Sequence, residues 1–86
     1  MTDKPAHVGI IQLDEGGIIG YHEATVSQIL VVLEGEGWVR TGTNCKVKIT
    51  VGDAVLWEKG EGHETSSEKR LIAIVIESEG LEISSF

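Results

Sequence analysis

Residues 52–63 read GDAVLWEKGEGH, and this stretch decides the fold. It joins a Gly-Asp turn at Gly52 to a short alternating segment, a glycine at position 60 and His63 three residues later. Apolar residues that alternate between turn residues are typical of a half-buried strand. The stretch therefore predicts a strand over 54–57 and a histidine that points into a barrel.

Similar short β-branched runs, separated by glycine-containing turns, recur along the chain. No stretch combines a 3.6-residue period with helix caps, so helices are not expected. The sequence indicates a tight turn at Gly35-Glu36-Gly37, between two strands. The expected strands cover residues 8–13, 18–23, 28–34, 38–41, 45–51, 54–57, 63–65, 71–77 and 81–83. So many short strands predict an all-β antiparallel sandwich or barrel.

Length and composition favour one globular domain. The chain has 86 residues, of which 41% are hydrophobic, and we expect a single domain over 1–86 with a polar leader at 1–6 and a loose tail at 84–86. A single cysteine, Cys45, excludes a disulfide framework and favours a reducing compartment. It begins an alternating strand, on the face expected to point inward. With no apolar leader segment, the expected location is cytoplasmic.

The charge balance bears on partners. Seven Lys and Arg residues stand against 14 Asp and Glu residues, for a net charge of −7. An acidic chain without a basic stripe is a poor ligand for phosphate backbones, so nucleic acid is not an expected partner. The longest apolar run, 29–33, is too short to span a membrane. Because that run is apolar on both faces, its outer face needs a cover, and we expect a homodimer.

Two glycine and histidine patterns resemble the motifs of the cupin superfamily. The first family motif, G-x5-H-x-H-x3or4-E-x6-G, is matched by Gly16, His22 and Gly35, with Gln28 in place of the glutamate. The second, G-x5-P-x-G-x2-H-x3-N, is matched by Gly52, Gly60 and His63, with Glu58 and Ser67 in place of proline and asparagine. The resemblance covers roughly 16–67 and implies a cupin-like jelly-roll barrel, an antiparallel double-stranded β-helix.

The resemblance also implies a metal site that is altered in this chain. Metal-binding cupins usually hold their ion with three histidines and one glutamate, which fall here on His22, Ala24, Gln28 and His63. Alanine cannot ligate, and glutamine offers only a neutral oxygen. The implied ligands are therefore His22, Gln28 and His63, holding weakly one divalent transition metal such as Zn, Ni, Mn or Fe.

The longer spacing of the first motif leaves an alternative frame. In that frame Tyr21 and Glu23 take the first two ligand positions, and Glu23 supplies a carboxylate. A small molecule is the expected partner, in a pocket whose walls we expect to come from Trp57, Leu30, Val32, Val39 and Val55.

Three kinds of function follow from the resemblance. One is a metal-dependent enzyme of the dioxygenase, isomerase or lyase type that acts on a small molecule in the barrel. The second is a non-catalytic binding or sensor module, which would use the same pocket. The third is a stand-alone regulatory or structural dimer that has lost its chemistry, and a fold alone does not assign a reaction.

Overall fold

A computed structural model describes residues 6–42 and 45–79 of the chain, and all of its regular elements are strands. They are β1 (Ala6–Leu13), β2 (Ile18–Glu23), β3 (Gln28–Thr41), β4 (Val47–Thr50), β5 (Ala54–Trp57) and β6 (Gly62–Ser78). Every pairing is antiparallel. The all-β antiparallel prediction is confirmed, and the expected strand at 81–83 lies outside the described residues.

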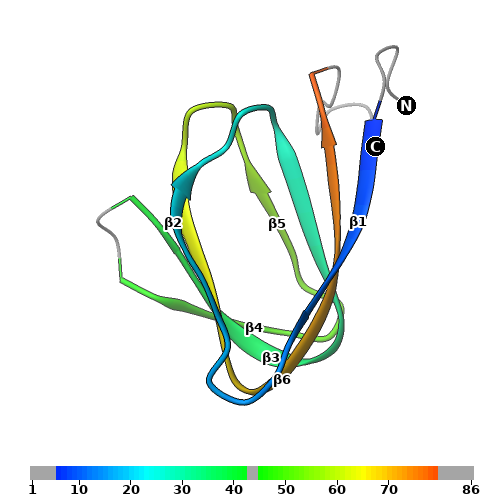
Figure 1. Cartoon of the computed structure of the whole chain (residues 1–86), viewed down its shortest axis with the longest axis vertical. Helices are drawn as coiled ribbons and strands as arrows, with labels where there is room; N and C mark the ends of the chain where they lie inside the picture. The colour runs from blue at the N-terminus through cyan, green and yellow to red at the C-terminus, as the bar shows by residue number, and fades with distance from the viewer. Residues whose placement is uncertain (1–5, 43–44, 80–86) are drawn as a thin grey trace.

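Two long strands, β3 and β6, belong to both layers of the barrel. The first half of β3 and the second half of β6 pair with each other and with β5 and β1. The other halves pair with each other and with β4 and β2. The two layers meet where the long strands bend, at the lower end of the molecule in Figure 1, and the strands diverge toward the upper end.

The tight turn expected at 35–37 is wrong, because these residues lie inside β3. The β3–β6 register shifts between Val32 and Glu34 and again between Gly35 and Gly37. Gly35 has φ 76°, and a Cβ there would collide with the backbone carbonyl of Arg70. These glycines serve a bulged bend where two strand backbones approach closely, which is a second common role of glycine within strands. For the same reason the strands expected at 63–65 and 71–77 are one strand, β6.

The core lies between the two layers. Leu30, Val32, Leu71 and Ala73 are almost fully buried, and Val39, Ile49 and Trp57 extend the cluster. Cys45 is exposed, contrary to its expected inward position. Regular pairing of β4 begins only at Val47, so the alternation that starts at Cys45 does not place that residue against the core.

The outer face of the layer formed by β1, β6, β3 and β5 is also apolar. One cross-strand row runs Val8, Ile76, Ile29, Leu56, and the next runs Ile10, Ile74, Val31, Ala54. Val8 and Ile10 are 68% and 71% exposed. No described strand packs over these rows.

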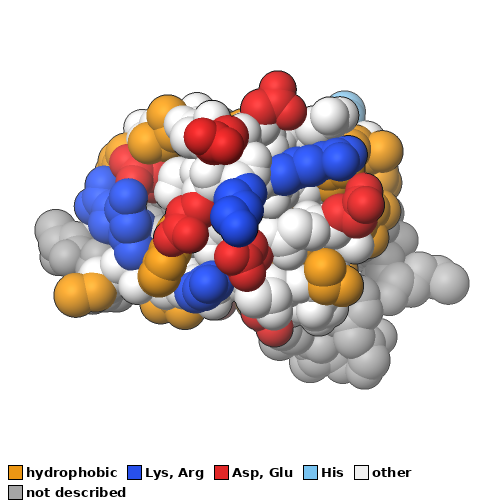
Figure 2. Space-filling model, turned by 90° about the horizontal axis from the view of Figure 1, so that it is seen from below, with side chains coloured by type: hydrophobic (Ala, Val, Ile, Leu, Met, Phe, Trp, Pro, Cys, Tyr) orange, Lys and Arg blue, Asp and Glu red, His pale blue; other side chains and the backbone are white. Residues whose placement is uncertain are grey.

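The lower end of the molecule has a different surface. Figure 2 shows Lys and Arg side chains interspersed with Asp and Glu side chains over this end. Lys48 lies 3.4 Å from a carboxylate oxygen of Glu36, and Arg70 lies 3.9 Å from one of Glu34. The part of the chain that the structure describes contains no helix with the length and apolar character of a membrane span.

Candidate functional site in the barrel

A pocket of about 320 Å³ opens between the two layers, at the end of the barrel where the strands diverge. Its apolar wall includes Ile11, Ile19, Leu30, Trp57 and Val75. Its polar lining consists of His7, His22, Gln28, His63, Thr65 and Glu77, and Val8, Gly9 and Ile10 on β1 complete the lining. An apolar cavity with a few convergent polar groups is the usual form of a small-molecule site.

Three rings form the centre of the pocket. The indole of Trp57 stacks on the imidazole of His63, with ring centroids 4.0 Å apart and an interplanar angle of 12°. The His22 ring meets the other imidazole edge-on at 4.3 Å. His22 and His63 are directly opposite each other on β2 and β6, which explains why their rings touch. Trp57 comes from the other layer, and its Nε1–H donates a 2.9 Å hydrogen bond to Oγ1 of Thr41.

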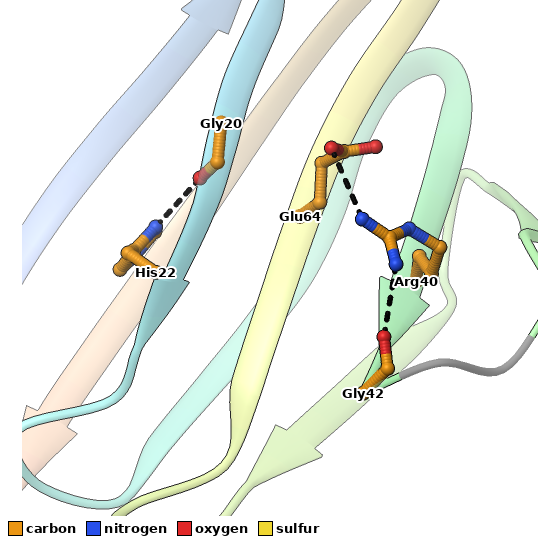
Figure 3. A network of polar contacts seen from close by, with 5 residues as sticks. All are labelled: Gly20, His22, Arg40, Gly42 and Glu64. Carbon is orange, nitrogen blue, oxygen red and sulfur yellow. Dashed lines mark hydrogen bonds and ion pairs between the residues drawn. The ribbon is translucent and has the colours of Figure 1, made fainter.

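Backbone carbonyls fix the tautomers of both histidines. Nδ1 of His22 lies 2.9 Å from the carbonyl oxygen of Gly20, a contact drawn in Figure 3. Nδ1 of His63 lies 3.4 Å from that of Glu61. Because a carbonyl oxygen can only accept, each Nδ1 carries the proton, and each neutral ring keeps a lone pair on Nε2. Both Nε2 atoms are therefore available to accept a hydrogen bond or to bind a metal.

Burial disfavours the charged form of His63. Its side chain is 3% exposed, and burial lowers its pKa below the ordinary value of 6.5. The hydrogen bond to the Glu61 carbonyl raises the pKa, but by less than burial lowers it. Among the smaller effects, the nearby His22 lowers the pKa, and the Glu61 and Glu77 carboxylates raise it. Burial outweighs these opposing effects.

A second row of pocket residues crosses all four strands of the opposite layer. His7 on β1 is opposite Glu77 on β6, which is opposite Gln28 on β3, which in turn is opposite Trp57 on β5. Directly opposite residues project from the same face of a sheet, and all four line the pocket. Neither His7 nor the Glu77 carboxylate was among the residues expected at the site. Only the register reveals that this carboxylate shares a face with Gln28.

The structure separates the expected pocket walls into two groups. Leu30 and Trp57 line the pocket. Val32 and Val39 are buried in the core, and Val55 packs against that core without lining the pocket. Val32 lies one row deeper than Leu30, nearer the bend of the barrel, where the layers close.

The structure distinguishes the two frames of the first motif. Tyr21 lies on the opposite side of β2 from His22, where its ring covers Gly62 and lies 5.2 Å from the Arg40 guanidinium. Arg40 in turn bonds to Glu64 and to the Gly42 carbonyl (Figure 3). Glu23 is exposed and does not line the pocket. The pairing with His63 is made by His22.

The donor set fits only a loosely held metal ion. Two neutral imidazoles and the Gln28 amide are available, and Gln28 is 7% exposed. Ala24 is buried, with its backbone bonded to Gly60 and Glu61. Within residues 6–42 and 45–79, no three His, Cys, Asp or Glu side chains are grouped closely enough to hold a metal. A firmly held catalytic ion usually has three protein ligands, commonly including an anionic one.

Comparison with solved structures gives the fold class. A cupin of the RmlC-like type from Methanocaldococcus jannaschii matches with a TM-score of 0.84 and 13% identity, over 93% of this chain and 75% of that chain. A predicted oxalate decarboxylase from Thermotoga maritima matches with a TM-score of 0.72 and 24% identity, over 80% of this chain and 62% of that chain. A DMSP lyase from Ruegeria pomeroyi matches with a TM-score of 0.81 and 21% identity, over 94% of this chain and 41% of that chain. At these identities the likeness shows a shared fold.

The sequence comparisons agree with the structural ones. No curated protein sequence matches the chain. The family model described as the cupin domain matches residues 9–77, which runs from within β1 to near the end of β6 and includes His22 and His63. The chain therefore belongs to the cupin domain family.

Proposed function

We propose that this cupin binds a small molecule in the pocket between its two layers, against the stacked rings of His63 and Trp57. The observation that carries the proposal is this stack, because it presents a flat apolar surface beside two imidazole lone pairs. Aromatic rings supply contact area, and a few polar groups orient the ligand. An enzyme and a binding module would both use this pocket.

A variant that fills the pocket tests the proposal. Gly9 lines the pocket, and a Cβ built on it meets no atom within 4 Å. Gly9→Leu should therefore fill the pocket without displacing its neighbours. Thr50→Leu, at an exposed position of β4, adds a leucine elsewhere. In a thermal-shift screen of small amines, alcohols, sugars and carboxylates, compounds that stabilise the wild type and Thr50→Leu should not stabilise Gly9→Leu. Equal stabilisation of all three proteins would contradict the proposal.

A second candidate function is metal-dependent chemistry in the same pocket. The free Nε2 atoms of His22 and His63 support it, and Gln28 would add a neutral oxygen. A divalent transition metal such as Zn, Ni, Mn or Fe would supply Lewis-acid or redox chemistry when bound. The chain's own residues would hold the ion through neutral donors only, so its affinity should be weak.

Calorimetric titration separates this candidate from simple ligand binding. Zn²⁺ and Ni²⁺ should bind with about one ion per chain, and His63→Gln should abolish the binding. The exposed His7 is the control, because His7→Gln should leave metal affinity unchanged if the ion lies between the other two histidines. Absence of binding to the wild type would remove the metal candidate and leave the small-molecule proposal in place.

A further inference from the structure

The row formed by His7, Glu77, Gln28 and Trp57 defines the charge of the pocket. Glu77 is the only Asp, Glu, Lys or Arg residue among those that line it. Within the described residues, its carboxylate has no ion-pair or hydrogen-bond partner. A half-buried carboxylate at the edge of an apolar cavity loses part of its hydration and gains from a partner that restores it.

Two further polar groups of the pocket are hydrogen-bond acceptors. Nε2 of both His22 and His63 carries a lone pair, because each Nδ1 faces a carbonyl oxygen. The Gln28 amide is directly opposite Glu77 and is likewise without a partner among the described residues. A ligand that donates hydrogen bonds can satisfy the two imidazole lone pairs, the Gln28 amide oxygen and the Glu77 carboxylate. A carboxylate ligand would place acceptor against acceptor and charge against like charge.

The apolar part of the pocket lies within the same cavity. Leu30 and Val75 are neighbours on the row next to Gln28 and Glu77, and Trp57 completes the wall. An alkyl or aryl group would bury apolar area there, at roughly 25 cal/mol per Å². An ammonium group close to the indole face would gain an additional cation–π attraction.

We propose that the pocket selects a primary amine or ammonium compound with a short apolar body, and that Glu77 is the specificity-determining residue that receives the ammonium group. This inference rests on the proposed small-molecule function and adds the ligand class. Small anions, including carboxylates, are disfavoured by the same residue.

Butylammonium, butanol and butyrate test the class, because they share an apolar body and differ in the polar end. Binding is followed by tryptophan fluorescence in a Trp38→Phe background, in which Trp57 is the only tryptophan. Butylammonium should bind about tenfold more tightly than butanol, the gain expected for a charge-assisted hydrogen bond, and butyrate should bind most weakly. Glu77→Gln should reduce the preference for the ammonium compound to less than about twofold.

Glu79→Gln is the matched control, since it removes the same charge from an exposed position outside the pocket. It should leave the preference unchanged. Equal binding of the three compounds, or a preference that survives Glu77→Gln, would overturn the inference and leave the small-molecule proposal intact. Absence of binding by all three, together with a failed thermal-shift screen, would overturn both.

Discussion

The indole of Trp57 lies nearly parallel to the imidazole of His63, with the ring centroids 4.0 Å apart. The two residues come from opposite layers of the barrel, so their contact joins the layers at the open end. The hydrogen bond from Trp57 to Thr41 acts at the same place, because Thr41 is directly opposite His63 on the neighbouring strand. The stack therefore links the two layers and also lines the pocket.

Removal of the indole should destabilise the fold strongly. Trp57 is 2% exposed, and Trp57→Ala should lower the free energy of unfolding by about 3–5 kcal/mol. Trp57→Phe keeps a ring against His63 but loses the hydrogen bond to Thr41, and should cost about 1–2 kcal/mol. Urea unfolding followed by circular dichroism measures both changes. Trp38→Phe, on a half-buried residue outside the pocket, should cost less than Trp57→Phe, and the reverse order would contradict the assignment.

Stability should fall in acid through His63. Its pKa in the fold is below the ordinary 6.5, so the unfolded chain takes up a proton that the folded chain resists. This contribution to stability is complete above about pH 6.5 and is lost as the pH falls toward the folded-state pKa. The free energy of unfolding, measured from pH 8 to pH 5, should decline less steeply for His63→Gln than for the wild type. An NMR titration midpoint for His63 at or above 6.5 would contradict the burial argument.

The bend of β3 should depend on Gly35. Its positive φ and its closeness to the Arg70 backbone leave no room for a side chain. Gly35→Ala should therefore lower the free energy of unfolding by about 2–4 kcal/mol, through backbone strain and the collision together. Thermal denaturation measures the loss. Gly20→Ala is the control, because a Cβ at Gly20 meets no atom within 4 Å, and comparable melting temperatures for the two variants would show that the bend tolerates a side chain.

Much of the fold could be predicted from local patterns. The alternation in 54–57 and the glycine-bounded runs gave the strand positions, and the resemblance of the histidine spacings gave the barrel. The bend at 35–37 was misread as a turn, because glycine has the same local signature whether a chain reverses or merely approaches another backbone. Only long-range pairing with β6 distinguishes the two cases.

For a similar reason, the pocket contains both residues that the local sequence indicated and one that it did not. The two histidines were expected to meet, and their rings lie 4.3 Å apart. Glu77 was missed because it follows the apolar run 71–76, where a terminal acid resembles an ordinary solvated strand end. Glu77 points inward because β6 pairs with β1 and β3 in a register that places it opposite His7 and Gln28. That register cannot be read from the sequence around Glu77. Val32 and Val39 also point inward, but they are buried in the core and do not line the pocket. Alternation along a strand indicates which face of the sheet a side chain is on, and not whether that side chain reaches the pocket.

The most direct test of the account is an NMR titration of the wild-type protein with butylammonium, observed at the two indole Nε1–H resonances. Trp57 lines the pocket, whereas Trp38 lies on the outside with its Nε1–H bonded to Glu68. The Trp57 resonance should shift with the ligand, together with those of His63 and Gln28, while the Trp38 resonance stays in place. A shift at Trp38 with none at Trp57 would show that the ligand binds elsewhere and that the space between the two layers is not the binding site.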